Sequence, residues 1–166
     1  MHRVKDITII AAFAAILFIQ EQALSFLPNI QLTVFLLVLY SKVFKLWKVL
    51  VIIAIHVLLD NLFMGSFSFY YFPFMLLGWS TVPIIINVFF KNNDNPIVLA
   101  FIGFGCAFIY SWMFAIPQVL FTETDIFAYL IADSLFEVIL AVSSFITILW
   151  LFKPCYKIIK DIESKY

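Results

Sequence analysis

Residues 96–121 read PIVLAFIGFGCAFIYSWMFAIPQVLF and contain no Asp, Glu, Lys or Arg. A helix needs about 20 predominantly apolar residues to cross the hydrocarbon core of a membrane, which is about 30 Å thick. This stretch exceeds that length and has Pro117 near its end. It therefore predicts a membrane-spanning helix with room to tilt.

The composition of the whole chain supports the same interpretation. Of its 166 residues, 65% are hydrophobic and 12% are charged, and the mean hydropathy is +1.10. Soluble domains are about 45–50% apolar and about 25% charged. Such a small polar fraction cannot cover the surface of a water-soluble enzyme, and two cysteines do not make a disulfide scaffold. Lipid is expected to surround most of the side chains.

Five further apolar stretches predict helices of the same kind. With the first, the expected helices cover residues 5–27, 30–44, 47–64, 69–90, 96–121 and 126–152. Pro28 is expected to close the first helix and Pro154 the last, and the second helix is short for a full span. No stretch alternates apolar and polar residues as the strands of a membrane barrel do. We expect one all-α membrane domain over residues 1–166, a bundle of six transmembrane helices.

The basic residues predict the orientation of this bundle. All ten Lys and Arg fall near the two termini or near the connections between the second and third and the fourth and fifth helices. The opposite connections carry Glu123 and Asp125 and no basic residue. The positive-inside rule then places the basic side, with both termini, in the cytoplasm. The first helix is expected to stay uncleaved, because no small-x-small motif follows residues 7–19 cleanly.

A few ionisable and amide residues interrupt the apolar stretches. An ionisable group inside a membrane is costly and normally faces the bundle interior or a water-filled cavity, so each is a candidate for function. The candidates are Glu21, Gln31, His56, Asp60, Asn61, Asp133 and Glu137, with Gln20, Gln22, Thr33, Ser111, Gln118 and Tyr129 around them. In the predicted topology nearly all of them lie in the outer half of the membrane. A channel or proton relay would need polar groups at both depths, so this asymmetry favours a pocket that captures a small polar solute from outside.

The acidic candidates have two possible roles. His56 and Asp60 are four residues apart and share a helix face, as do Asp133 and Glu137. Asp60 and Glu137 could pair with neighbouring donors and join helices. For Glu137 this structural role and ligand binding are equally open, whereas Asp60 and Asp133 lie nearer the expected mouth and favour ligand binding.

Aromatic residues supply a second group of candidates. Tyr70, Trp79, Tyr110 and Trp112 have rings that stack well on a flat heterocycle, although aromatic residues also collect at membrane interfaces without binding anything. No enzymatic activity, cofactor or metal is expected. His56 and Asp60 supply only two metal ligands, and Cys106 has no neighbouring His. No nucleotide-binding loop of the GxxxxGK type occurs, so ATP would have to be used by another chain.

Two sequence stretches and an alanine stripe resemble a known family. The stretches are QEQALSFLPNIQLTVFLLVLYSK at residues 20–42 and HVLLDNLFMGSF at residues 56–67, and the stripe is Ala11, Ala12, Ala14 and Ala15. Together with the predicted six-helix bundle, they resemble the substrate-binding S components of energy-coupling factor (ECF) transporters. The likeness covers nearly the whole chain.

The resemblance implies a vitamin-type micronutrient bound with high affinity near the outer face of a bacterial plasma membrane. It also implies a partner module of one transmembrane coupling subunit and two ATPase subunits, against which the S component topples to release its cargo. Ala11 and Ala15 match the small-xxx-small element expected to contact the coupling subunit; the alternative is that they pack within their own bundle. The first outer connection, about residues 28–30, is shorter than in better-known members, so residues 65–72 are an alternative cover for the pocket.

The expected function is therefore a binding subunit for a vitamin or related small heterocycle, with no nucleic-acid partner. A mouth rich in acids and free of Lys and Arg disfavours polyanions and favours a neutral or basic ring, held by Asp60 and Asp133. Cobalamin, riboflavin and folate remain open. The alternatives are a membrane scaffold protein of cell-wall elongation and an autonomous secondary transporter.

Overall fold

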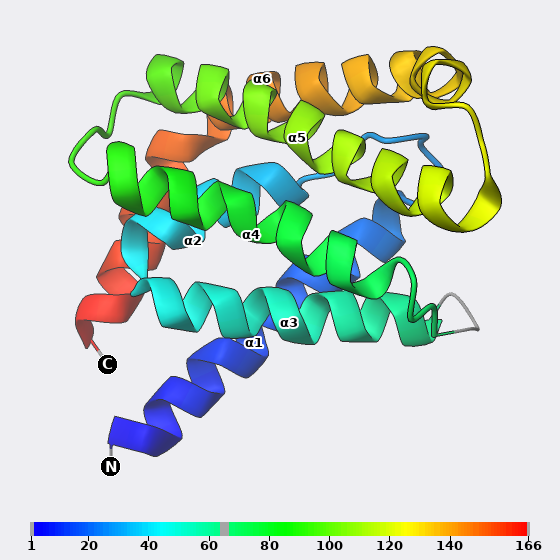
Figure 1. The fold of residues 1–166 in the computed structure, drawn as a ribbon. Helices are drawn as coiled ribbons and strands as arrows, with labels where there is room; N and C mark the ends of the chain where they lie inside the picture. The colour runs from blue at the N-terminus through cyan, green and yellow to red at the C-terminus, as the bar shows by residue number, and fades with distance from the viewer. Residues whose placement is uncertain (1, 64–66, 166) are drawn as a thin grey trace.

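The computed structural model describes residues 2–63 and 67–165, and side chains within 4–63 and 67–162. These residues form helices and no strand (Figure 1). The helices are α1 (His2–Leu24), α2 (Thr33–Val43), α3 (Leu46–Phe63), α4 (Phe72–Phe89), α5 (Pro96–Thr122) and α6 (Ile126–Lys165). The all-helical fold predicted from the apolar stretches is confirmed.

Five of these helices are long and apolar enough to cross a membrane. They are α1, α3, α4, α5 and α6, which gives the chain the character of a multi-pass membrane protein. With 11 residues, α2 is about 16 Å long at 1.5 Å per residue, about half the thickness of the hydrocarbon core. The count of six full spans stays a prediction.

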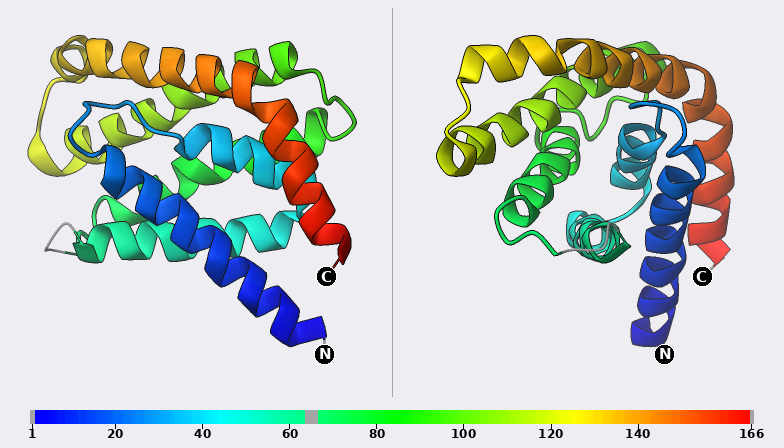
Figure 2. Two further views of the ribbon diagram at one scale, coloured as in Figure 1. Left: turned by 180° about the vertical axis from the view of Figure 1, so that it is seen from behind. Right: turned by 90° about the vertical axis from the view of Figure 1, so that its right-hand side faces the viewer.

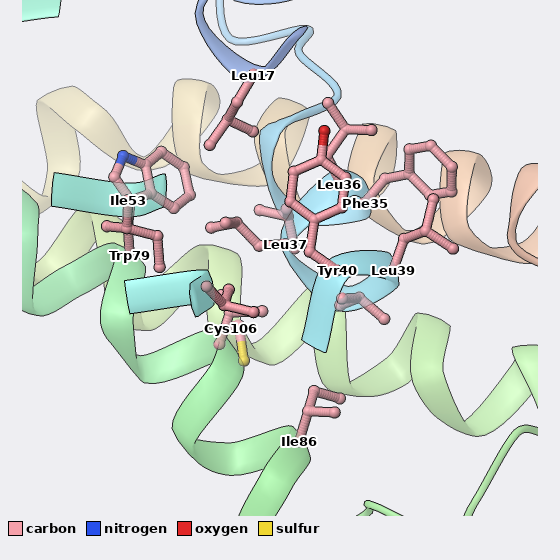
Figure 3. Packing of buried hydrophobic residues seen from close by; sticks show 14 of the residues in the cluster. Leu17, Phe35, Leu36, Leu37, Leu39, Tyr40, Ile53, Trp79, Ile86 and Cys106 are labelled. Carbon is pink, nitrogen blue, oxygen red and sulfur yellow. The ribbon is translucent and has the colours of Figure 1, made fainter. Parts of the chain in front are cut away.

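Helix α2 forms the centre of the bundle. Every residue from Thr33 to Ser41 is buried, and α2 contacts all five other helices. A helix that is apolar on every side is typical of a fully buried position. Figure 3 shows Leu37 and Tyr40 of α2 among the buried side chains that include Leu17 of α1, Ile53 of α3 and Trp79 of α4.

Most helix ends lie within three residues of their predicted positions, and two proline predictions are wrong. Pro28 does not close α1, because the helix already ends at Leu24. The chain then passes through turns, in which Leu27 N donates to Leu24 O at 2.8 Å. The first outer connection therefore covers residues 25–32 and is longer than predicted. Pro154 does not end α6, which continues to Lys165. A proline removes only its own N–H bond and crowds one carbonyl, which bends a helix without always ending it.

The two ends of the bundle differ in charge. The N-terminus, the C-terminus and the α2–α3 and α4–α5 connections lie at one end, and the α1–α2 and α5–α6 connections lie at the other (Figures 1 and 2). The first of these, called the basic end below, carries Lys45 and Lys91 on its connections and Lys42 and Lys48 in the adjoining helix turns. The other, called the acidic end, carries Glu123 and Asp125 on its connection.

A buried lysine fixes α2 at the basic end. The Lys42 side chain is only 1% exposed, and its Nζ lies 2.7 Å from Asp94 Oδ1. The same Nζ donates to the carbonyl oxygens of Phe90, Lys91 and Asn93 at 3.1, 2.6 and 3.0 Å. Carbonyls beyond the end of a helix lack intrahelical partners and favour a cation. Lys42 thus ties α2 to the end of α4.

Helix α6 bends where its ribbon passes from orange to red (Figure 2). Its first part lies along α5 and its last part descends toward the C-terminus (Figures 1 and 2). Thr147 Oγ1 donates to the carbonyl oxygens of Ser143 at 2.7 Å and Ser144 at 3.1 Å. Hydroxyl groups that return hydrogen bonds to the preceding turn often bend helices.

Gly103 allows α5 to approach α6 and α2 closely. A Cβ atom at this position would overlap Ile148 Cδ1 of α6 and lie 3.4 Å from Val34 Cγ1 of α2. Gly105, two residues further along α5, faces open space, with no heavy atom within 4 Å of an added Cβ. The two glycines thus form a matched pair on one helix.

We expect Gly103→Ala to lower the free energy of unfolding by about 1–3 kcal/mol, because the added methyl group overpacks the contact with Ile148. Gly105→Ala should leave it unchanged or raise it by up to about 1 kcal/mol, because alanine is the better helix former. Thermal denaturation in detergent measures both. Equal stability of the two variants would contradict the close packing at Gly103.

Candidate solute-binding cavity

A cavity of about 710 Å³ opens at the acidic end of the bundle. Such a volume falls in the range of about 300–1,000 Å³ typical of small-molecule sites. Five helices and the connections beside them supply its walls. The lining residues are Glu21, Asn29, Gln31, Asp60, Asn61, Ser68, Tyr71, Met75, Tyr110, Ser111, Phe114, Tyr129, Asp133 and Leu140.

A second, smaller cavity of about 330 Å³ adjoins the first under the α1–α2 connection. The two share Glu21, Asn29, Gln31 and Asp60. Asn29 has a positive φ of 55°, a left-handed conformation that Asn tolerates better than most residues, and its Nδ2 donates to Phe136 O of α6 at 3.1 Å. Residues 25–32 therefore form one rim of the cavity and are fastened across it to α6.

Gln20 holds this rim against the start of α2. Its Nε2 donates to Thr33 Oγ1 at 2.8 Å and to Leu17 O at 3.0 Å, and its Oε1 accepts from Leu32 N at 2.8 Å. Thr33 Oγ1 donates in turn to Gln31 Oε1 at 2.9 Å. The first N–H groups of a helix have no intrahelical partner, and Gln20 supplies one to Leu32 N at the start of α2. Through Thr33 it also positions Gln31 on the cavity wall.

Three carboxylates from three helices line the cavity. Glu21 Oε2 of α1 lies 3.1 Å from Nε2 of the buried His56 on α3, although the imidazole is not aligned for a hydrogen bond. Asp60 Oδ1 of α3 accepts from Gln22 Nε2 at 3.1 Å. No side chain of the described residues donates a hydrogen bond to Asp133 of α6, on the opposite wall. The three acids thus differ in how far the protein itself satisfies them.

Aromatic rings form the other walls. Tyr71 stacks on Phe114 with ring centroids 6.0 Å apart and an interplanar angle of 23°. Tyr110 stacks on the buried Trp79 with centroids 3.5 Å apart and an angle of 18°. Gly78 provides the room for this pair, because a Cβ atom there would lie 2.8 Å from Tyr110 Cδ2. Tyr110 presents one face to the cavity and is supported by Trp79 behind it.

The structure brings six of the predicted site residues onto the cavity lining: Glu21, Gln31, Asp60, Asn61, Tyr110 and Asp133. Two more lie one layer behind it, His56 next to Glu21 and Trp79 next to Tyr110. Tyr70 is 58% exposed and packs on Phe121, away from the lining.

Trp112 and Glu137 also lie outside the lining, and they contact each other. Trp112 of α5 is 53% exposed, and its Nε1 donates to Oε2 of Glu137 of α6 at 3.3 Å. This bond joins α5 to α6, which is the structural role that the sequence left open for Glu137.

Six lining residues were not among the predicted candidates: Asn29, Ser68, Tyr71, Met75, Phe114 and Leu140. Phe114 is four residues after Tyr110, and helical spacing could have placed both on one face. Ser68 and Tyr71 lie between α3 and α4, where no periodic pattern exists. They belong to the segment 65–72 considered as a cover, of which Gly65 and Ser66 lie outside the described residues.

The cavity offers acceptors and aromatic faces to a solute. Its acceptors are carboxylate, amide and hydroxyl oxygens, and its lining includes no Lys or Arg. Across the part of the chain that the structure describes, no three His, Cys, Asp or Glu side chains converge to hold a metal ion. The arrangement fits non-covalent binding of a small polar molecule that carries a ring.

Comparison with models of known protein families, with curated protein sequences and with solved structures finds no match for this chain.

We expect Gln20→Ala to lower the free energy of unfolding by about 1–3 kcal/mol, because the partly buried Leu32 N–H and the buried Thr33 hydroxyl lose their hydrogen bonds. Gln118→Ala is the control, since Gln118 bonds only to the exposed Thr122, and it should cost less than about 0.5 kcal/mol. Thermal denaturation in detergent again measures both. If Gln20→Ala proved as mild as the control, the rim would not depend on Gln20.

Proposed function

We propose that this chain is the solute-binding S component of an ECF-type transporter. It captures a vitamin or a related small heterocycle from outside the cell and passes it to an ATP-driven module. The observation that carries the proposal is the cavity itself, which is lined by polar groups at one end of a bundle whose remaining interior is apolar.

The contrast between the two ends supports capture over conduction. Helix α2 runs from the rim toward the basic end, and its residues from Val34 to Leu39 are apolar and buried. Away from the cavity and the layer behind it, the buried polar side chains of the described residues include the hydroxyl groups of Ser41, Ser80 and Ser144. The ionisable side chains of Lys42 and Glu137 are also buried there, and they pair with Asp94 and Trp112. A channel or proton relay would need a continued polar path. The solute therefore leaves only when the whole subunit moves.

The orientation follows from the charges. The lysines of the connections gather at the basic end, which the positive-inside rule assigns to the cytoplasm of a bacterial cell. The cavity then opens to the exterior, where a scarce nutrient has to be captured.

The surface of α1 supports the proposed coupling contact. Ala11 and Ala15 are exposed, whereas Ala14 between them is buried against the bundle. The N-terminal part of α1 reaches beyond the rest of the bundle at the basic end (Figures 1 and 2), and its Asp6 pairs with Lys48 of α3. Small residues on an exposed helix face let another helix approach closely in a membrane. The proposed partner here is the transmembrane coupling subunit, which also carries the two ATPases.

The test uses the full chain, purified alone and together with the coupling subunit and both ATPases. We expect the chain alone to retain one of the radiolabelled vitamins thiamine, riboflavin, biotin, folate or cobalamin, and cellular uptake to require the ATPases. A scaffold protein would retain none of them. Accumulation in cells that lack the ATPases would instead indicate a secondary transporter, and either result would overturn the proposal.

The coupling face has its own prediction. Ala11→Leu combined with Ala15→Leu should reduce co-purification of the coupling subunit by about tenfold or more, since bulky side chains prevent close helix approach. Solute binding by the purified chain should be unchanged, because both residues lie far along α1 from Glu21. Ala132→Leu, at an exposed position on α6, is the control. Retained association in the double variant would exclude this face as the contact.

A further inference from the structure

We infer that the cavity selects an organic cation, namely a ring-bearing solute with one protonated amine or quaternary ammonium group that sits against Asp133. The inference rests on the proposed function and names the substrate class of the same site.

The charge of the lining gives the sign of the ligand. Glu21, Asp60 and Asp133 reach the cavity, and no Lys or Arg does. All ten basic residues of the sequence occur near the termini or the basic connections. An anion entering this cavity would lose its hydration with no counter-charge to replace it, whereas a cation would gain one.

The protein satisfies two of the three acids from behind. Glu21 Oε2 lies 3.1 Å from Nε2 of the buried His56, within ion-pair distance although not aligned for a hydrogen bond. Asp60 already accepts a hydrogen bond from Gln22. These two acids therefore already have a polar protein group beside them.

Asp133, on the α6 wall, has no such compensation. Asp133 receives no hydrogen bond from any described residue, and no basic side chain stands beside it. One helical turn further on and outside the lining, Glu137 differs from Asp133, because its Oε2 accepts a hydrogen bond from Trp112, although its Oε1 has no partner within residues 4–63 and 67–162. Asp133 is partly exposed and lines the cavity, so a positive group of a ligand can approach its oxygens directly. The positive group of the ligand therefore sits on this side.

The aromatic walls define the rest of the ligand. Tyr129 lies one helical turn before Asp133 on the same lining, and Tyr71, Tyr110 and Phe114 add ring faces to it. Such faces attract an ammonium group through cation–π contacts and stack on a flat ring. A volume of about 710 Å³ is far larger than a metal ion needs and admits an organic molecule.

The test compares probes that share a ring and differ in charge. Tryptamine is a cation, tryptophol is neutral and indole-3-acetate is an anion, and all three carry the same indole. Binding to the purified full chain in lipid nanodiscs is measured by calorimetry. We expect tryptamine to bind about tenfold or more tightly than tryptophol, and indole-3-acetate most weakly. Choline and its uncharged isostere 3,3-dimethylbutanol repeat the comparison without an indole.

Variants then locate the charge contact. Asp133→Asn should weaken tryptamine binding by about tenfold and leave tryptophol binding within about twofold. Asp125→Asn is the matched control, because Asp125 lies at the same end outside the lining and an asparagine keeps its hydrogen bond with Ala128 N. This control should bind all probes as the unmodified chain does.

Two results would overturn the inference. One is that neither cation binds more tightly than its neutral partner, which includes the case in which no probe binds. The other is that Asp133→Asn weakens tryptamine and tryptophol equally. A chain that retained a neutral or anionic vitamin and delivered it with the ATPases would fail this inference and keep the proposed function. A chain that bound cations but never associated with the coupling module would keep this inference and fail the proposed function.

Discussion

Backbone groups in the interior of this bundle have to find hydrogen-bond partners within the protein, and the short helix α2 makes that demand most acute. It is surrounded by the other five helices, and it is about half as long as a membrane is thick. Gln20 meets the need at its start, and Lys42 ties its end to α4. Because α2 stops short, the bundle is left unfilled at the acidic end, and the cavity occupies that space. The candidate site thus lies beyond the start of α2, where this central helix does not extend.

Hydropathy predicted the fold well, and it did so for a physical reason. Long apolar runs have few alternatives to helices inside a membrane, so most helix ends fell close to their predicted positions. Proline was the weak signal: Pro28 and Pro154 both read as terminators and neither ends its helix. Whether a proline bends a helix or stops it depends on the packing around it, which the local sequence does not contain.

The candidate site was harder to predict than the fold. Polar residues in apolar runs identified Glu21, Asp60 and Asp133 because such residues are rare there and rarely face lipid. The same logic could not separate Asp133 from Glu137, because the two residues are four apart and share one face of a helix. It also could not show that Trp112 donates a hydrogen bond to Glu137 outside the lining. Residues from irregular segments, such as Asn29 and Ser68, have no period to reveal them. The partner of a side chain is a tertiary property.

Helix α1 has one further consequence, which concerns mechanics. It is a continuous helix from His2 to Leu24, with Asp6 in its first turns paired to Lys48 of α3 and its last turns carrying Glu21 and Gln22 to the cavity (Figure 2). A stiff rod transmits a tilt from one end to the other. A tilt of the first turns would therefore shift Glu21 relative to His56 and Gln22 relative to Asp60. Under the proposed function, a tilt imposed at the basic end would thus loosen the grip on the captured molecule without opening a passage through the core.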